Sequence, residues 1–376
     1  MDKIVLISEL IKKKKFDQAK INCQEILEKN LKNFEFLNIF AIVLFNLEEY
    51  EKSIEKWKLA LKANSRYYEG YNNLGNALLN LKQYKDALIN LNKAAELKSN
   101  NYELYNKIGI AYQGLNEDEK SLKFYNHALK IKKDYLPSIR NKFLLLKKIN
   151  KYFEAIKELD KLLLYGDDKI KVYTQKGKIY SDLNNSVKVI ENFSKVLSID
   201  PEFPFLFGEI MNHKLKMCDW KNFDDDLEKI KKSVENNKKI LPPFIGAILF
   251  DTPFIQLKNS RIWTKSIDTK ENFNFEFYKK KNDKIKIGYF NANFRSHANG
   301  YLTNRLYDLH DRSKFEIFGF YFGPPLNKKD KLQNKIVGSF DKFIDISSSN
   351  ILEVKKIVQK YNIDIAVDLM GHSGGD

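Results

Sequence analysis

The stretch YNNLGNALLNLKQYKDALINLNKA, residues 71–94, decides the fold of the first part of the chain. Large apolar residues recur in it at helical spacing, and small residues stand where a second helix would have to approach closely. The same pattern returns 34 residues later and 34 residues earlier without a gap. Carried in both directions, it fits six copies within residues 1–206, of which the first is the weakest.

Each copy predicts a pair of helices that cannot bury its apolar face alone. Tyr71, Leu74 and Leu78 form one face of the first helix, while Gly75 and Ala87 leave room for the second. Neighbouring pairs must therefore stack, and we expect a right-handed α-solenoid with a concave groove. The period and the residue types resemble tetratricopeptide repeats, and the resemblance implies binding of extended peptides or partner proteins in that groove.

Asn38, Asn72 and Asn106 occupy the same position in three consecutive copies, on the helix that lines the groove in this family. Each side chain has a donor and an acceptor, so the three predict a ladder that holds the backbone of a bound peptide. The alternative is compositional, since the whole chain is rich in Asn, Lys and Ile.

The net charge of +16 suggests nucleic acid as a possible partner, but its distribution argues against one. Residues 284–376 carry +4 and residues 1–283 carry +12, so the excess is spread rather than gathered in a stripe. Most lysines fall on the polar faces of helical patterns. We therefore interpret them as solvated and do not expect nucleic acid as a partner.

Several classes of protein are disfavoured by simple patterns. No stretch approaches the ~18 consecutive apolar residues of a membrane span. The first residues place an apolar run ahead of four lysines, the reverse of a signal peptide, which favours a cytoplasmic location. Cys23 and Cys218 lack the spacing of a disulfide framework or a zinc site, so no metal site is expected.

Beyond Pro201 the repeat pattern is lost and the organisation changes. Residues 207–283 predict a helical bridge, in which prolines at 242–243 and 253 are expected to stop helices. From residue 284 strands alternate with helices, which predicts a parallel sheet and an incomplete Rossmann-like domain over 284–376. The expected strands are 284–291, 315–322, 340–346 and 363–370, and the expected helices are 300–310 and 351–361.

Ligands of such sheets bind beyond the carboxyl ends of the strands. Two predicted loops fall at that edge, residues 292–299 after the first strand and residues 371–376 after the fourth. The second is rich in glycine, which lets backbone N–H groups approach a phosphate or a sugar closely. It supplies Gly371, His372 and Gly374 as candidate donor-binding residues, although many such loops are only turns.

Four ordered blocks in this part resemble the catalytic region of bacterial-type O-GlcNAc transferases, within the O-GlcNAc transferase and Spindly-like glycosyltransferase family. Cys218-Asp219-Trp220 in the bridge and the preceding repeats extend the resemblance over nearly the whole chain. The blocks are IKIGYFNANFRSH (285–297), HDRSKFE (310–316), FDKFID (340–345) and IDIAVDLMGH (363–372).

The resemblance implies a GT-B type glycosyltransferase. Such an enzyme transfers N-acetylglucosamine from UDP-N-acetylglucosamine, without a metal, to Ser or Thr of proteins held by the repeats. It also implies a site role for His297, as a base or as a group that positions the donor, and a structural role is the alternative. His127, His213 and His310 fall on helical patterns, where packing or surface roles are expected.

Two departures weaken the catalytic expectation. Asn293 and Ala298 stand where the family usually has an acidic residue and a proline. In the family a second Rossmann-like lobe, which holds most of the nucleotide, follows the region matched here. We therefore expect an incomplete copy that does not turn over alone. The alternative is a non-catalytic adaptor whose repeats recruit a protein partner.

Overall fold

The fold was analysed in a computed structural model, which describes residues 3–27, 33–267 and 284–370. The chain divides into two compact units, Met1–Asp226 and Leu227–Asp376, and each is described by itself. None of the helices in these described ranges is long and apolar enough to cross a bilayer.

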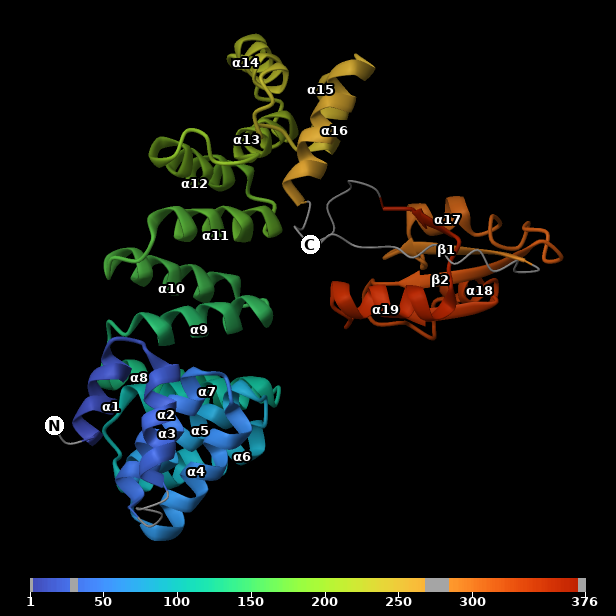
Figure 1. The fold of residues 1–376 in the computed structure, drawn as a ribbon. Helices are drawn as coiled ribbons and strands as arrows, with labels where there is room; N and C mark the ends of the chain where they lie inside the picture. The colour runs from blue at the N-terminus through green and yellow to red at the C-terminus, as the bar shows by residue number, and fades with distance from the viewer. Residues whose placement is uncertain (1–2, 28–32, 268–283, 371–376) are drawn as a thin grey trace. The chain divides into compact units, whose positions relative to one another are not determined.

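The first unit opens with the six predicted helix pairs, in which every helix contacts the next one along the chain. Figure 1 shows the later pairs lying as successive layers, which confirms the repeat solenoid. The pairs are α1 (Lys3–Lys12) with α2 (Phe16–Leu27), α3 (Phe34–Asn46) with α4 (Tyr50–Ala63), α5 (Tyr68–Asn80) with α6 (Tyr84–Leu97), α7 (Tyr102–Gly114) with α8 (Asp118–Ile131), α9 (Leu136–Lys148) with α10 (Tyr152–Leu164), and α11 (Lys169–Asp182) with α12 (Ser186–Ile199).

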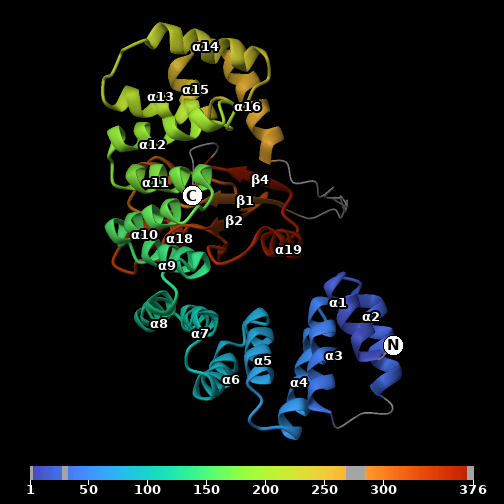
Figure 2. The ribbon, with the colours of Figure 1, turned by 90° about the vertical axis from the view of Figure 1, so that its left-hand side faces the viewer.

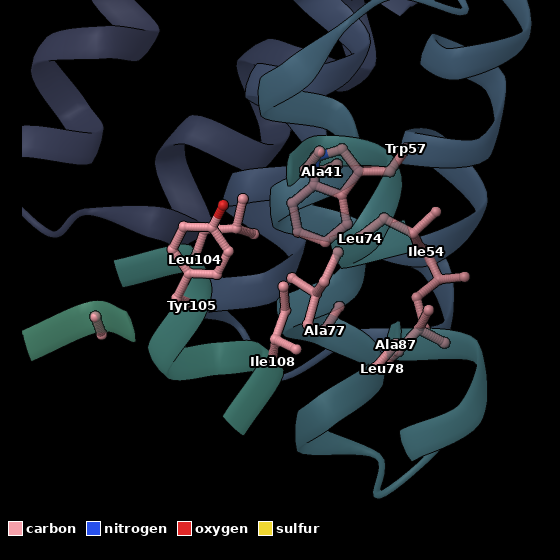
Figure 3. Packing of buried hydrophobic residues seen from close by; sticks show 13 residues of the cluster. Ala41, Ile54, Trp57, Leu74, Ala77, Leu78, Ala87, Leu104, Tyr105 and Ile108 are labelled. Carbon is pink, nitrogen blue, oxygen red and sulfur yellow. The ribbon is translucent and has the colours of Figure 1, made fainter. Parts of the chain in front are cut away.

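Small residues set the distance between the two helices of a pair. A Cβ added at Gly109 would lie 2.5 Å from the Tyr125 ring, and one added at Gly177 would overlap the Phe193 ring. Ser121 stands where the neighbouring copies have Ala87 and Ala155, and its hydroxyl donates to the Gly109 carbonyl at 2.8 Å. Figure 3 shows the continuous core that results, with Trp57 beside Ile54 and Leu74.

The turn inside each pair repeats as regularly as the core. A residue with positive φ occurs every 34 positions, at Lys14, Glu48, Lys82, Asn116, Asn150 and Asn184. At Lys82 the turn is closed by the N–H of Gln83 bonding to the Leu78 carbonyl at 2.8 Å and that of Lys82 bonding to the Leu79 carbonyl at 3.0 Å. This is the Schellman pattern, which usually places glycine at the left-handed position.

Four further helices follow the repeats: α13 (Leu206–Lys216), α14 (Phe223–Glu235), α15 (Pro243–Leu249) and α16 (Pro253–Ile267). The helical character of this region is confirmed, but the expected effect of its prolines was wrong. Pro243 and Pro253 begin helices instead of ending them. The first residues of a helix have no intrahelical acceptor for their N–H groups, so proline loses nothing there.

The second unit contains a four-stranded parallel sheet with the order β3-β2-β1-β4. Its strands are β1 (Ile285–Asn291), β2 (Phe315–Tyr321), β3 (Lys342–Asp345) and β4 (Ile365–Asp368). Its helices are α17 (Ala298–Thr303), α18 (Lys331–Gly338) and α19 (Ile351–Tyr361). The predicted parallel sheet is confirmed, and the architecture is consistent with part of a GT-B lobe.

Alternation along the strands gives the sheet two apolar faces. Ile287 and Tyr289 of β1 point to one face, where they pack with Phe294, Tyr307 and the α18 residue Ile336. Phe318 and Phe320 of β2 point to the other face, which α19 covers. Figure 2 shows β1 lying between β2 and β4.

Two details differ from the predictions. A helix was expected over residues 300–310, with Leu302, Leu306 and Leu309 on one face, but α17 ends at Thr303. Leu302 and Leu309 are 86% and 71% exposed, and the residue that anchors this segment is the fully buried Tyr307. The short helix α18 was not predicted, because its apolar pattern extends over only eight residues.

Candidate functional site

The candidate site lies where the strand order of the sheet reverses. Strands β1, β2 and β3 follow one another in space, whereas β4 pairs with the opposite side of β1. Gly288 is consequently registered with Phe318 on one side and with Ala366 on the other. The chain leaves β1 and β4 at neighbouring positions of the carboxyl edge, and ligands of open α/β sheets bind in the crevice at such a point of reversal.

Side chains of the β1 loop bond to the segment after β4. The Asn299 amide donates to the Leu369 carbonyl at 3.1 Å, and the Asn293 amide lies 3.5 Å from the Met370 sulfur. The backbone N–H of Leu369 donates to the Phe290 carbonyl at 3.1 Å. We call residues 292–299 together with Leu369 and Met370 the rim site.

A third segment fixes the middle of the β1 loop. The carboxylate of Asp330, at the N-cap of α18, accepts from the Ser296 backbone N–H and from the Ser296 hydroxyl, both at 2.7 Å. It also accepts from the Gln333 backbone N–H at 3.0 Å. The N–H groups of Ser296 and Gln333 and the Ser296 hydroxyl lower the pKa of Asp330 to about 2. The carboxylate is therefore ionised at neutral pH and holds the loop against α18.

His297 follows at the N-cap of α17, with its side chain exposed at the rim site. Its Nδ1 accepts a hydrogen bond from the Asn299 backbone N–H at 3.2 Å. A neutral imidazole whose Nδ1 accepts must carry its proton on Nε2. His297 thus presents an N–H donor toward solvent, at the carboxyl edge of the sheet where the sequence placed it.

Close backbone packing supports this geometry at Gly300. A Cβ at that position would collide with the carbonyl oxygen of Arg295 and lie 3.1 Å from that of Asn293. The Arg295 guanidinium in turn donates to the Asn293 side-chain oxygen at 3.2 Å. Because Asn293 is neutral, where the resembled family usually has an acid, no carboxylate at that position offsets the Arg295 charge.

His372, Gly371 and Gly374 lie outside the described residues, and their role in donor binding stays a prediction. In the described parts of the chain, no group of three or more His, Cys, Asp and Glu side chains could hold a metal ion.

The other three histidines have packing roles, as expected. His213 is 3% exposed, and its Nδ1 and Nε2 lie 2.9 and 3.4 Å from the hydroxyls of Ser186 and Ser181. Burial, with a smaller effect of the Lys216 charge, lowers its pKa to about 4. His310 is hydrogen-bonded to the Tyr289 hydroxyl at 2.8 Å. His127 stacks on the Tyr105 ring, with 3.9 Å between the ring centroids.

The three repeated asparagines form bonds between neighbouring repeats. Oδ1 of Asn38 accepts from the indole N–H of Trp57 at 2.9 Å and from the Asn73 amide at 3.1 Å. Asn72 accepts from the Lys107 ammonium at 3.0 Å.

Asn106 repeats the arrangement of Asn38. Its Oδ1 accepts from the Ser138 hydroxyl at 2.9 Å and from the Asn141 amide at 3.0 Å. The carbonyl oxygens of Asn38 and Asn106 each already have two donors, which fills their lone pairs. The peptide ladder stays a prediction, and at these two positions it would have to use the amide N–H groups alone.

Sequence comparisons match two families along the chain. Residues 217–376 match the profile of glycosyl transferase family 41, and residues 68–101, 102–135 and 170–203 match the tetratricopeptide repeat. The UDP-N-acetylglucosamine–peptide N-acetylglucosaminyltransferase of Caenorhabditis elegans is 23% identical over 176 residues. The chain thus contains tetratricopeptide repeats and a region similar to O-GlcNAc transferases.

A second relative of this O-GlcNAc transferase-like protein is the probable UDP-N-acetylglucosamine–peptide N-acetylglucosaminyltransferase SEC of Arabidopsis thaliana, 24% identical over 92 residues. The two matches cover 42% and 24% of this chain but only 15% and 9% of the relatives. A solved structure of PilF from Pseudomonas aeruginosa superposes with a TM-score of 0.47 at 17% identity, over 56% of this chain and 96% of that one.

Proposed function

We propose that the O-GlcNAc transferase-like protein takes part in protein O-glycosylation, with UDP-N-acetylglucosamine as the sugar donor and Ser or Thr of repeat-bound proteins as acceptors. The observation that supports this most strongly is the rim site, where the β1 loop carrying His297 is bonded to the segment after β4 through Asn299 and Leu369. The family 41 match over residues 217–376 supplies the reaction class.

The geometry of His297 favours positioning over proton abstraction. Its Nδ1 is occupied by the Asn299 N–H, and the remaining ring nitrogen carries the proton. A donor of this kind holds an oxygen of the sugar or the phosphate, whereas a general base needs a free lone pair. The charge of Arg295, which is paired with the neutral Asn293 amide, adds attraction for the diphosphate. The transfer needs no metal in this proposal.

Calorimetric titration with UDP-N-acetylglucosamine tests the proposal. The unmodified chain is expected to bind, and His297→Ala is expected to bind about tenfold more weakly, because one hydrogen bond to the donor is lost. His297→Gln keeps an N–H near the position of Nε2 and should recover part of the affinity. His127→Ala removes a histidine of the repeats and should leave the affinity unchanged.

Absence of binding by the unmodified chain would contradict the donor site. The alternative, a non-catalytic adaptor that works through its repeats, would then be favoured. Equal affinities for the His297 and His127 variants would remove His297 from the site and leave the donor proposal to other residues. A cytoplasmic location is part of the same proposal.

A further inference from the structure

A basic cavity lies in the repeats, and its lining includes neither the three repeated asparagines nor a residue of the rim site. It has a volume of about 820 Å³ and is formed by α8, by Lys142 of α9, and by the first and last parts of α10. Five lysines line it, namely Lys123, Lys130, Lys142, Lys151 and Lys161. Glu119 is its only acidic lining residue among the described side chains.

Two of these lysines are held in place by a buried carboxylate. Glu158 of α10 is 4% exposed and accepts from the Lys142 ammonium at 2.7 Å and from the Lys161 ammonium at 2.9 Å. One negative charge therefore faces two positive ones, and a net positive charge remains at this wall of the cavity. Fixing the ammonium groups in advance lowers the entropic cost of binding an anion there.

The other three lysines are exposed, and no ion pair is found for them in the described part of the chain. Lys123 and Lys130 are on α8, and Lys151 is the N-cap of α10. Half-buried Leu122 and Leu129 supply apolar surface between the charged groups. The cavity thus combines an excess of positive charge with an apolar surface of limited size.

We infer that this cavity binds an acidic peptide segment of a partner protein, one that places an apolar side chain among its Asp and Glu residues. Carboxylates complement the lysines, and the apolar side chain covers Leu122 and Leu129. A nucleic acid is a poorer fit, because a continuous phosphate backbone would leave the leucines uncovered. The site does not depend on the sugar donor, so it extends the proposed function without resting on it.

Binding of a fluorescein-labelled peptide of Asp, Glu and Leu residues, followed by fluorescence anisotropy on the full chain, tests the inference. A peptide with Asn and Gln in place of the acids is the uncharged comparison. The acidic peptide is expected to bind, more weakly as ionic strength rises, and the uncharged peptide is not. Replacing Lys123, Lys130 and Lys151 together by Glu should weaken binding about tenfold or more.

A matched control reverses three exposed lysines of earlier repeats, Lys58→Glu, Lys62→Glu and Lys85→Glu. It changes the net charge by the same amount as the cavity variant. Its affinity for the acidic peptide should stay within about twofold of that of the unmodified chain, because only the general electrostatic attraction is reduced. Glu119→Gln removes the negative charge at the cavity and should tighten binding about threefold. Circular dichroism establishes that each variant is folded.

Three results would overturn the inference. The first is failure of the acidic peptide to bind the unmodified chain. The second is an equal loss in the cavity variant and in the matched control, which would show a general charge effect. The third is tighter, cavity-dependent binding of a single-stranded oligonucleotide, which would assign the lysines to nucleic acid instead.

Discussion

The Asn141 amide donates to Oδ1 of Asn106 at 3.0 Å, across 35 residues and from one repeat to the next. The same offset joins Asn73 to Asn38 and Lys107 to Asn72. Because the repeat is 34 residues long, the donor in each pair lies one position later in its repeat than the acceptor does in the repeat before it. A bond between repeats thus recurs with the period of the fold, and its donor is amide in two cases and ammonium in one.

Asn106→Ala is expected to lower the free energy of unfolding by about 1–3 kcal/mol, because it leaves the donors of Ser138 and Asn141 without their acceptor in a buried place. Urea unfolding monitored by circular dichroism measures the change. Asn72→Ala is the comparison: Asn72 is only half-buried, and its oxygen accepts from one donor among the described residues, the Lys107 ammonium, so a smaller cost is expected. Equal losses in the free energy of unfolding for the two variants would show that burial of Asn106 does not determine the effect.

Gly300→Ala should disturb the rim site. The added methyl group would collide with the Arg295 carbonyl, so the β1 loop must move or α17 must unwind. We expect a loss of more than about 1 kcal/mol in stability of the α/β unit and a weaker response to the sugar donor. Gly338→Ala, where an added Cβ meets nothing within 4 Å, should be neutral or stabilising by up to about 1 kcal/mol. Thermal unfolding of both variants compares them, and equal melting temperatures would contradict the expectation.

Acidification should lower the free energy of unfolding of the first unit, because His213 of α13 becomes protonated. Its pKa is lowered to about 4 in the folded state and is near 6.5 when unfolded. Between these values the unfolded chain binds more protons, so stability is complete above about pH 6.5 and falls as the pH drops toward 4. The contribution is at most about 3 kcal/mol.

Urea unfolding at pH 7, 6 and 5 measures this dependence. His213→Gln removes the titrating ring and should flatten the slope between pH 6.5 and 4, although its stability at pH 7 will also be lower. An unchanged slope in the variant would assign the effect to the carboxylates, which are more numerous but titrate at lower pH.

Lys82→Gly should stabilise the repeats by about 0.5–1 kcal/mol. Lys82 has a φ of 57°, a conformation that costs side-chain-bearing residues energy and that glycine adopts freely. Asn116→Gly, at the equivalent turn with a φ of 59°, should gain less, because asparagine tolerates the left-handed region better. Differential scanning calorimetry distinguishes them, and a destabilised Lys82→Gly variant would mean that the turn is not strained.

The repeats were predictable because their information is local and occurs six times. The helix pairs follow from the spacing of residues such as Leu74, Gly75 and Ala87. In the structure these residues lie where the two helices of a pair pack against each other. The turns were less visible. Lys14, Glu48 and Lys82 share a left-handed backbone with three asparagines, and only the asparagines are residues that usually mark such a position.

The asparagine positions show that a sequence period does not determine which way a side chain faces. A repeated Asn can face a groove or the next repeat, since both follow the same 34-residue period. The signal that could have separated them is the donor one position on, Asn73, Lys107 and Asn141, which recurs with the same period.

In the α/β unit, strand positions and the parallel arrangement were predictable, but the packing between loops was not. The placement of His297 after the first strand is sequential and was correct. The hydrogen bond from Ser296 to Asp330 joins residues that are far apart in the sequence. It could not be predicted, because α18 was not recognised and Asp330 was therefore not identified as its N-cap. The expected helix over residues 300–310 failed because Leu302, Leu306 and Leu309 mimic a buried face, whereas Tyr307 supplies the anchor.

The pairing of β1 with β4 has a consequence for the order of assembly. Phe318 can pair with Gly288 after a separation of about thirty residues, but Ala366 has to emerge before the other side of the strand is closed. During synthesis His297 would therefore be translated early, and the bond that joins its loop to the segment after β4 would form only once the chain has reached Leu369. A nascent polypeptide halted before that residue would carry His297 without the partner that anchors Asn299.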